Sequence, residues 1–180
     1  MQEKALHILR EVFGYDSFRP VQKEVIDSVM SGQDTLALLP TGGGKSLCFQ
    51  VPALTREGIC IVISPLIALM KDQVDNLKAR GIKAVAIYSG MSLKEIDTTL
   101  DNCIYGDFKF LYVSPERLKT DLFIERFKQM NVNLIAVDEA HCISQWGYDF
   151  RPTYLEIAAI RAYHPNVNVL ALTASATPKV

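Results

Sequence analysis

Short apolar runs recur along the chain, and most of them are continuous rather than alternating with polar residues. Six runs have this character, at residues 35–39, 59–64, 84–88, 108–113, 134–137 and 167–173. A strand shows this pattern when both of its faces are buried, as in a parallel sheet that is covered by helices. The six runs therefore predict the strands of a mainly parallel sheet.

The stretches between these runs carry helical signals. Within residues 66–77 apolar side chains recur at spacings of three and four, which places one apolar stripe on a helix of about 65–80. Pro20 predicts the first turn of another helix, which extends to Met30. Further helices are expected after Lys45, Ser92, Thr120 and Tyr154.

This alternation of strands and helices indicates the fold class. It predicts an α/β protein with a doubly wound, mainly parallel sheet flanked by helices. In such sheets ligands bind beyond the carboxyl ends of the strands. The loops that follow the predicted strands are therefore the places where functional residues are expected.

The composition is that of one globular domain. The chain has 180 residues, of which 49% are hydrophobic and 22% are charged, so intrinsic disorder is excluded. The formal charge is −1, which means that any contact with nucleic acid must come from a local patch rather than from the whole surface.

The sequence also carries signals about its surroundings. No stretch approaches the ~20 apolar residues of a membrane span, and the N-terminus lacks a signal-peptide core. The four cysteines are too far apart for a paired zinc motif, and free thiols indicate a reducing compartment. We expect a cytoplasmic protein, associated with the nucleoid in a bacterium or nuclear in a eukaryote. Because the chain ends directly after an apolar run, we also expect it to be a fragment of a longer protein.

The strongest candidate chemistry follows the first predicted strand, where residues 39–46 read LPTGGGKS. Three glycines let successive backbone N–H groups turn inward, and with the N-terminus of the next helix they form a site for phosphate groups. Lys45 can reach the β- and γ-phosphates of a nucleotide, and Ser46 can hold Mg²⁺. The expected nucleotide-binding residues of this loop are Thr41, Gly42, Gly43, Gly44, Lys45 and Ser46.

This match is imperfect, because the strict pattern G-x-x-x-x-G-K-[ST] requires glycine where this chain has Leu39. The alternative interpretation is a glycine-rich turn with an exposed lysine. The position between a strand and a helix favours the phosphate loop.

An acidic pair follows the predicted strand at 134–137. Asp138 emerges at the carboxyl end of this strand, where it can hold Mg²⁺, and Glu139 can polarise the attacking water. Phosphoryl transfer needs mainly positioning and charge neutralisation, which these carboxylates and Lys45 can supply. Taken alone, the acidic pair could also belong to a solvated loop.

Residues 138–141 read DEAH and continue as CISQWGYDFRP at 142–152. This string resembles the RecQ family of superfamily-two DNA helicases, which places an aromatic-rich loop of this composition after its Asp-Glu-Ala-His box. The chain differs from the family at Tyr148, where histidine is more usual, and at Ser175, where threonine is more usual. Further stretches resemble motifs of the same family, in the same order, at 13–22, 64–73, 112–117 and 172–178.

The resemblance implies that residues 1–180 are the first RecA-like motor domain of an ATP-dependent, 3′–5′ DNA helicase that acts in recombination and repair. ATP and Mg²⁺ are the implied cofactors, and single-stranded and forked DNA are the implied partners of a monomer. A second motor domain of the same chain, a zinc-binding segment and a winged helix are expected outside these residues. Because the second domain completes the catalytic cleft in relatives, we expect this chain alone to bind nucleotide weakly and to turn over little of it.

The resemblance also implies an adenine site. Gln22 would recognise the base edge, because an amide can both donate and accept a hydrogen bond. Arg19 would lie nearby, and Tyr15 would stack on the base. The alternative for Gln22 is an ordinary position on the polar face of the helix that follows Pro20.

A second implied role is the coupling of DNA to the nucleotide site. Trp146 can stack on bases without regard to sequence, although it could instead anchor the loop to the domain by packing. His141 can bridge the nucleotide site to the motif at 173–177, or it can be a satisfied structural histidine. Lys71 and Arg117 can contact DNA phosphates or be solvated charges. The residues assigned to coupling are His141, Gln145, Trp146, Phe150, Arg151, Thr173 and Thr177.

Two other functions remain open on the sequence. Another superfamily-two motor, such as an RNA helicase, would use Lys45, Asp138 and Glu139 in the same way, and only residues 142–152 favour the DNA helicase. A nucleotide-dependent binding module without turnover is the other alternative, and the water-activating Glu139 speaks against it.

Overall fold

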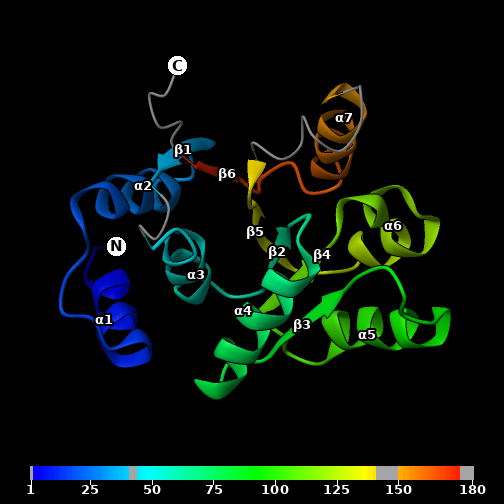
Figure 1. Cartoon of the computed structure of the whole chain (residues 1–180), viewed down its shortest axis with the longest axis horizontal. Helices are drawn as coiled ribbons and strands as arrows, with labels where there is room; N and C mark the ends of the chain where they lie inside the picture. The colour runs from blue at the N-terminus through cyan, green and yellow to red at the C-terminus, as the bar shows by residue number, and fades with distance from the viewer. Residues whose placement is uncertain (1, 41–43, 141–149, 175–180) are drawn as a thin grey trace.

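The computed structural model describes residues 2–40, 44–140 and 150–174, and for 150–154 and 174 it describes the backbone alone (Figure 1). The predicted residues Thr41, Gly42, Gly43, His141, Gln145, Trp146 and Thr177 lie outside the described residues.

The described residues form one parallel sheet of six strands, in the order β1-β6-β5-β2-β4-β3. The predicted α/β fold with a parallel sheet is therefore confirmed, and each predicted apolar run corresponds to a strand. Their ends differ by up to two residues from the expected ones, as at β5, which begins at Val132. The strands are β1 (Thr35–Leu39), β2 (Ile59–Ile63), β3 (Ala84–Ile87), β4 (Phe110–Val113), β5 (Val132–Val137) and β6 (Val169–Ala174).

Helices connect these strands, and two helical elements were not predicted. The first is α1, whose buried residues recur every four positions at Ala5, Leu9 and Phe13, and the second is a short 3₁₀ helix, η1. The α-helices are α1 (Gln2–Phe13), α2 (Pro20–Met30), α3 (Leu47–Leu54), α4 (Ile67–Ala79), α5 (Leu93–Tyr105), α6 (Asp121–Phe127) and α7 (Phe150–Arg161), and η1 spans Pro115–Lys119.

Helix α7 begins earlier than the sequence pattern predicted. The helix was expected after Tyr154, but it starts at Phe150 and includes Pro152. Proline is tolerated in the first turn of a helix, because the N–H that it lacks would have no intrahelical partner there.

The helices cover both faces of the sheet, as a doubly wound fold requires. Helices α2, α3 and α4 pack on one face through side chains such as Val29, Phe49 and Met70. Helices α5, α6 and α7 pack on the other face through side chains such as Leu100, Phe127 and Ile160 (Figure 1). Helix α1 forms a smaller cluster against α2 and α3. No helix within the described ranges has the length and apolar character needed to cross a membrane.

The parallel arrangement places the carboxyl ends of all six strands at one edge of the sheet. We call this the carboxyl edge. The loop that carries Lys45 follows β1 there, and Asp138 follows β5. The opposite edge, where the strands begin, is called the amino edge below.

Candidate active site

An ion pair joins two segments of the carboxyl edge. Lys45 lies between β1 and α3, and Glu139 lies two residues beyond the end of β5. The Lys45 Nζ donates to Glu139 Oε1 at 2.7 Å, and the two side chains are only 17% and 15% exposed. The structure therefore brings together the lysine and the carboxylate that the sequence predicted as catalytic residues.

Asp138 is a buried carboxylate beside this pair, with 3% of its surface exposed. Its backbone N–H donates to the Ile63 carbonyl oxygen at 2.8 Å, which continues the ladder between β2 and β5 by one residue. Burial raises the pKa of Asp138, and the charge of Glu139 adds to this effect, whereas the charge of Lys45 opposes it. The site therefore holds a carboxylate whose negative charge is incompletely compensated by the protein.

Glu139 has a backbone conformation that is uncommon outside glycine. Its φ is 55°, in the left-handed region, which costs a side-chain-bearing residue roughly 1–2 kcal/mol. The Glu139 N–H donates to Asp138 Oδ1 at 2.9 Å and so ties the turn to the preceding carboxylate. Strained residues of this kind gather at functional sites, where the surrounding structure holds them.

Gln22 connects helix α2 to the phosphate loop. Its Oε1 accepts from the Arg19 N–H at 3.0 Å, and its Nε2 donates to the Gly44 carbonyl oxygen at 3.2 Å. Gln22 is buried, with 4% of its surface exposed, and its contact with the Arg19 N–H is one that an ordinary glutamine in the first turn of a helix also makes. Recognition of adenine by Gln22 stays a prediction.

The contact between Gln22 and Gly44 depends on the absence of a side chain at position 44. Its φ is +73°, and a Cβ at this position would lie 2.1 Å from Gln22 Nε2. A larger residue would therefore be strained by the left-handed backbone and would have to displace the Gln22 amide.

The remaining predicted residues lie at several places. Tyr15 is 54% exposed, and Arg19 at the start of α2 is also exposed. Ser46 is half-buried at the N-cap of α3, and Thr173 is half-buried on β6. The Lys71 Nζ lies 4.5 Å from the centre of the Tyr88 ring.

The carboxyl edge carries oxygen atoms that are suitable ligands for a magnesium ion. Asp138 offers a buried carboxylate and Ser46 a hydroxyl, and Mg²⁺ prefers oxygen ligands of these kinds. Because burial raises the pKa of Asp138, a neighbouring cation would stabilise its charged form.

Sequence analysis missed three polar residues that lead to Asp138. Gln50 on α3, Gln73 on α4 and Tyr112 on β4 form a chain of hydrogen bonds that ends at the Asp138 carboxylate. Gln73 and Tyr112 lie within the stretches 64–73 and 112–117 that resemble family motifs, but nothing in the sequence links either residue to Asp138. Only the fold shows that elements far apart in the chain bring them together.

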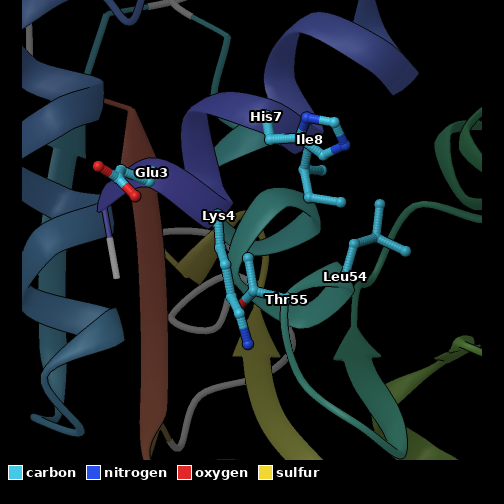
Figure 2. Close-up of a pocket in the computed structure, with 6 residues that line it drawn as sticks. All are labelled: Glu3, Lys4, His7, Ile8, Leu54 and Thr55. Atoms are coloured by element: carbon cyan, nitrogen blue, oxygen red, sulfur yellow. The ribbon is translucent and has the colours of Figure 1, made fainter.

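A separate pocket lies away from these residues. It is lined by Glu3, Lys4, His7 and Ile8 of α1 and by Leu54 and Thr55 at the end of α3 (Figure 2). Ser46 marks the opposite end of α3, so this pocket is no part of the site at the carboxyl edge.

Comparison with known proteins now places the chain in a family. The family model described as DEAD/DEAH box helicase matches residues 19–180. The chain belongs to the DEAD/DEAH box helicase family. The residues that match include the loop with Lys45 and the acidic pair that follows β5.

Within this family, RecQ proteins are similar over nearly the whole chain. The chain is 50% identical to the ATP-dependent DNA helicase RecQ of Haemophilus influenzae over 96% of its length, which is 28% of that protein. It is 50% identical to RecQ of Bacillus subtilis over 100% of its length, which is 31% of that protein. The resemblance to RecQ helicases expected from the sequence is confirmed, and the chain spans less than a third of these relatives.

A solved helicase structure has the same fold. The structure of a hypothetical ATP-dependent RNA helicase from Sulfolobus tokodaii superposes with a TM-score of 0.69 at 23% identity. The match covers 98% of this chain and 51% of that one. This likeness supports the DEAD/DEAH box fold and carries no information about DNA or RNA as the substrate.

Proposed function

We propose that this chain is the first motor domain of a 3′–5′ DNA helicase that uses ATP hydrolysis to move along single-stranded DNA and to unwind forks. The contact between Lys45 and Glu139 at 2.7 Å, beside the buried Asp138, is the observation that carries the proposal. It unites one cation and two carboxylates at the edge of the sheet where α/β proteins bind their ligands.

The ion pair has a direct mechanistic use. When ATP enters, Lys45 exchanges Glu139 for the β- and γ-phosphates, which carry more negative charge. Glu139 is then released to orient a water molecule and to accept its proton as the water attacks the γ-phosphorus, and ADP leaves. In this proposal the cation that pairs with Glu139 is the one that binds the phosphates of the substrate.

Asp138 and Ser46 are the residues that would hold Mg²⁺ with the nucleotide. When bound, the ion neutralises charge on the phosphate oxygens. The loop that carries Gly44 is proposed to bind the phosphates through backbone N–H groups. Tyr15, Arg19 and Gln22 are proposed to bind the adenine, and Gln22 contacts this loop at Gly44.

The choice of DNA rests on the RecQ relatives and on residues 142–152. DNA coupling is assigned to His141, Gln145, Trp146, Phe150 and Arg151, together with Thr173 and Thr177. Roles in recombination and repair, a monomeric state and a second motor domain in the same chain are part of this proposal. The greater length of the relatives leaves room for the second motor domain.

The test is a Glu139→Gln variant of the full-length protein. We expect ATP still to bind, because the amide keeps the size of the side chain, while DNA-stimulated hydrolysis falls by about 100-fold or more, as the loss of a general base predicts. The assay compares ATP binding and phosphate release in the variant and in the wild type, with DNA forks and RNA forks in parallel. Undiminished hydrolysis in the variant would contradict the role of Glu139, and preference for RNA forks would favour the RNA helicase.

A further inference from the structure

A line of polar side chains runs through the core toward Asp138. Gln50 Nε2 donates to the Tyr112 hydroxyl at 3.1 Å, and this hydroxyl donates to Gln73 Oε1 at 2.7 Å. Gln73 Nε2 then donates to Asp138 Oδ2 at 3.5 Å, the longest of the three contacts. Three elements, α3, α4 and β4, thereby contribute to one chain that ends on a single carboxylate oxygen.

The direction of these hydrogen bonds is determined by chemistry. A tyrosine hydroxyl has one proton, and burial raises the pKa of Tyr112 well above its ordinary value, so the proton stays on the ring oxygen. Because the hydroxyl accepts from Gln50, its proton goes to the carbonyl oxygen of Gln73. The NH₂ group of Gln73 must then face Asp138.

Two members of this line of hydrogen bonds, Gln50 and Tyr112, lie in the apolar core. Tyr112 is 1% exposed and has its ring against Phe49 and Phe110. Burial of a hydroxyl or an amide is unfavourable unless each finds a partner, and phenylalanine at position 112 would fill almost the same volume. The structure nevertheless aligns three polar groups there, and each has a partner along the line.

Asp138 is thereby held at both of its oxygens. Oδ1 accepts from the Glu139 N–H at 2.9 Å, and Oδ2 faces Gln73. Two donors on different elements define the rotation of the carboxyl group about its χ2 angle, which a single donor would leave freer. Groups that orient a metal-binding carboxylate in this way strongly affect metal affinity.

We propose that Gln50, Tyr112 and Gln73 form a positioning relay that sets the carboxylate of Asp138 for Mg²⁺-ATP. The proposal rests on the proposed function, because it assumes that Asp138 holds the ion. None of the three residues touches the nucleotide in this proposal, since they act through Asp138.

The test uses Gln73→Leu and Tyr112→Phe in the full-length protein, with Tyr105→Phe as the matched control on an exposed tyrosine. Binding of a fluorescent ATP analogue is titrated with Mg²⁺. We expect Gln73→Leu to raise the Mg²⁺ concentration at the midpoint by about tenfold, the size seen when a partner of a metal ligand is removed. Tyr112→Phe is expected to raise it less, and Tyr105→Phe is expected to leave it unchanged.

Two further measurements separate positioning from general damage. Binding of the analogue in EDTA should be unchanged in every variant, because the phosphate loop is intact. In the double variant, Tyr112→Phe should add little to the shift of the Mg²⁺ midpoint that Gln73→Leu causes, since both changes break the same line of hydrogen bonds. An unshifted Mg²⁺ midpoint in Gln73→Leu, whatever its hydrolysis rate, overturns the relay. A wild-type protein that hydrolyses no ATP with DNA present would instead contradict the proposed function.

Discussion

The two edges of the sheet use buried polar groups in opposite ways. At the amino edge, Arg56 donates to the carbonyl oxygens of Val29 and Asn133 at 2.7 and 2.8 Å and to Asn168 Oδ1 at 3.0 Å. At the carboxyl edge, Lys45 and Glu139 share one short contact, and Asp138 receives one donor at 2.9 Å and another at 3.5 Å.

The difference separates a structural network from a reactive one. The amino-edge network, defined here as Arg56, Asn133 and Asn168, joins the end of α2 to β5 and to the residue before β6. The hydrogen bonds that these side chains donate end on oxygens of the protein itself, so they hold segments of the protein together. At the carboxyl edge the charges have partners that a substrate can replace, which is the property that an active site requires.

The largest loss of stability is expected when the amino-edge network is removed. Arg56→Ala removes three hydrogen bonds from a charged donor to oxygens of three segments, so we expect the free energy of unfolding to fall by about 3 kcal/mol. The Val29 carbonyl oxygen keeps a donor in Asn168 Nδ2. Nucleotide affinity of the folded protein should be unchanged, because Arg56 lies at the edge away from Lys45. Denaturant unfolding and nucleotide titration measure the two quantities.

The exposed Arg80 supplies the control for this change. It donates to one carbonyl oxygen, that of Val12, at 2.9 Å, so Arg80→Ala should cost less than about 1 kcal/mol. Equal losses of stability in the two variants would show that the amino-edge network contributes no more to stability than one exposed hydrogen bond.

The next largest loss of stability is expected from alanine at one glycine of each edge. Gly32 precedes β1 and Gly44 follows it, and both have a positive φ, of +86° and +73°. A Cβ at Gly32 meets no atom within 4 Å, whereas one at Gly44 meets the Gln22 amide at 2.1 Å. We expect Gly32→Ala to cost about 1 kcal/mol of stability from the backbone alone and Gly44→Ala about 1 kcal/mol more.

Only the substitution at the carboxyl edge should also change function. Gly44→Ala must displace the Gln22 side chain, so nucleotide affinity is expected to fall in this variant and to stay unchanged in Gly32→Ala. The melting temperatures of the two variants measure the loss of stability, and nucleotide titrations measure the change in affinity. If both variants lost affinity alike, the contact between Gln22 and the loop would have no part in nucleotide binding.

Most of the structure at the carboxyl edge could be predicted from the sequence. Continuous apolar runs predicted all six strands, and Lys45 and the acidic pair stood directly after two of them. Local sequence carries this information, because the period of the apolar residues and the chemistry of the adjacent loop lie within a few positions.

The amino-edge network and the line to Asp138 could not be predicted in this way. Arg56 contacts residues 27, 77 and 112 positions away, and Tyr112 contacts Gln50 and Gln73 across 62 and 39 positions. The residues next to Arg56 or Tyr112 in the sequence give no sign of these partners. Their partners are set by the order of strands in the sheet, which the strand pattern alone did not specify.

The smallest expected effect concerns Glu139, where the carboxyl edge carries strain that the amino-edge network lacks. The φ of 55° is unfavourable for any residue with a Cβ, so glycine at this position should relieve it. Because Glu139→Gly and Glu139→Ala both remove the contact with Lys45, their difference reports the backbone alone. We expect the glycine variant to be more stable than the alanine variant by about 1 kcal/mol, while both should lack ATP hydrolysis. Denaturant unfolding of the two variants gives this difference. An alanine variant as stable as the glycine variant would mean that the turn relaxes once the side chain is lost, and that the strain belongs to the pairing with Lys45 rather than to the backbone.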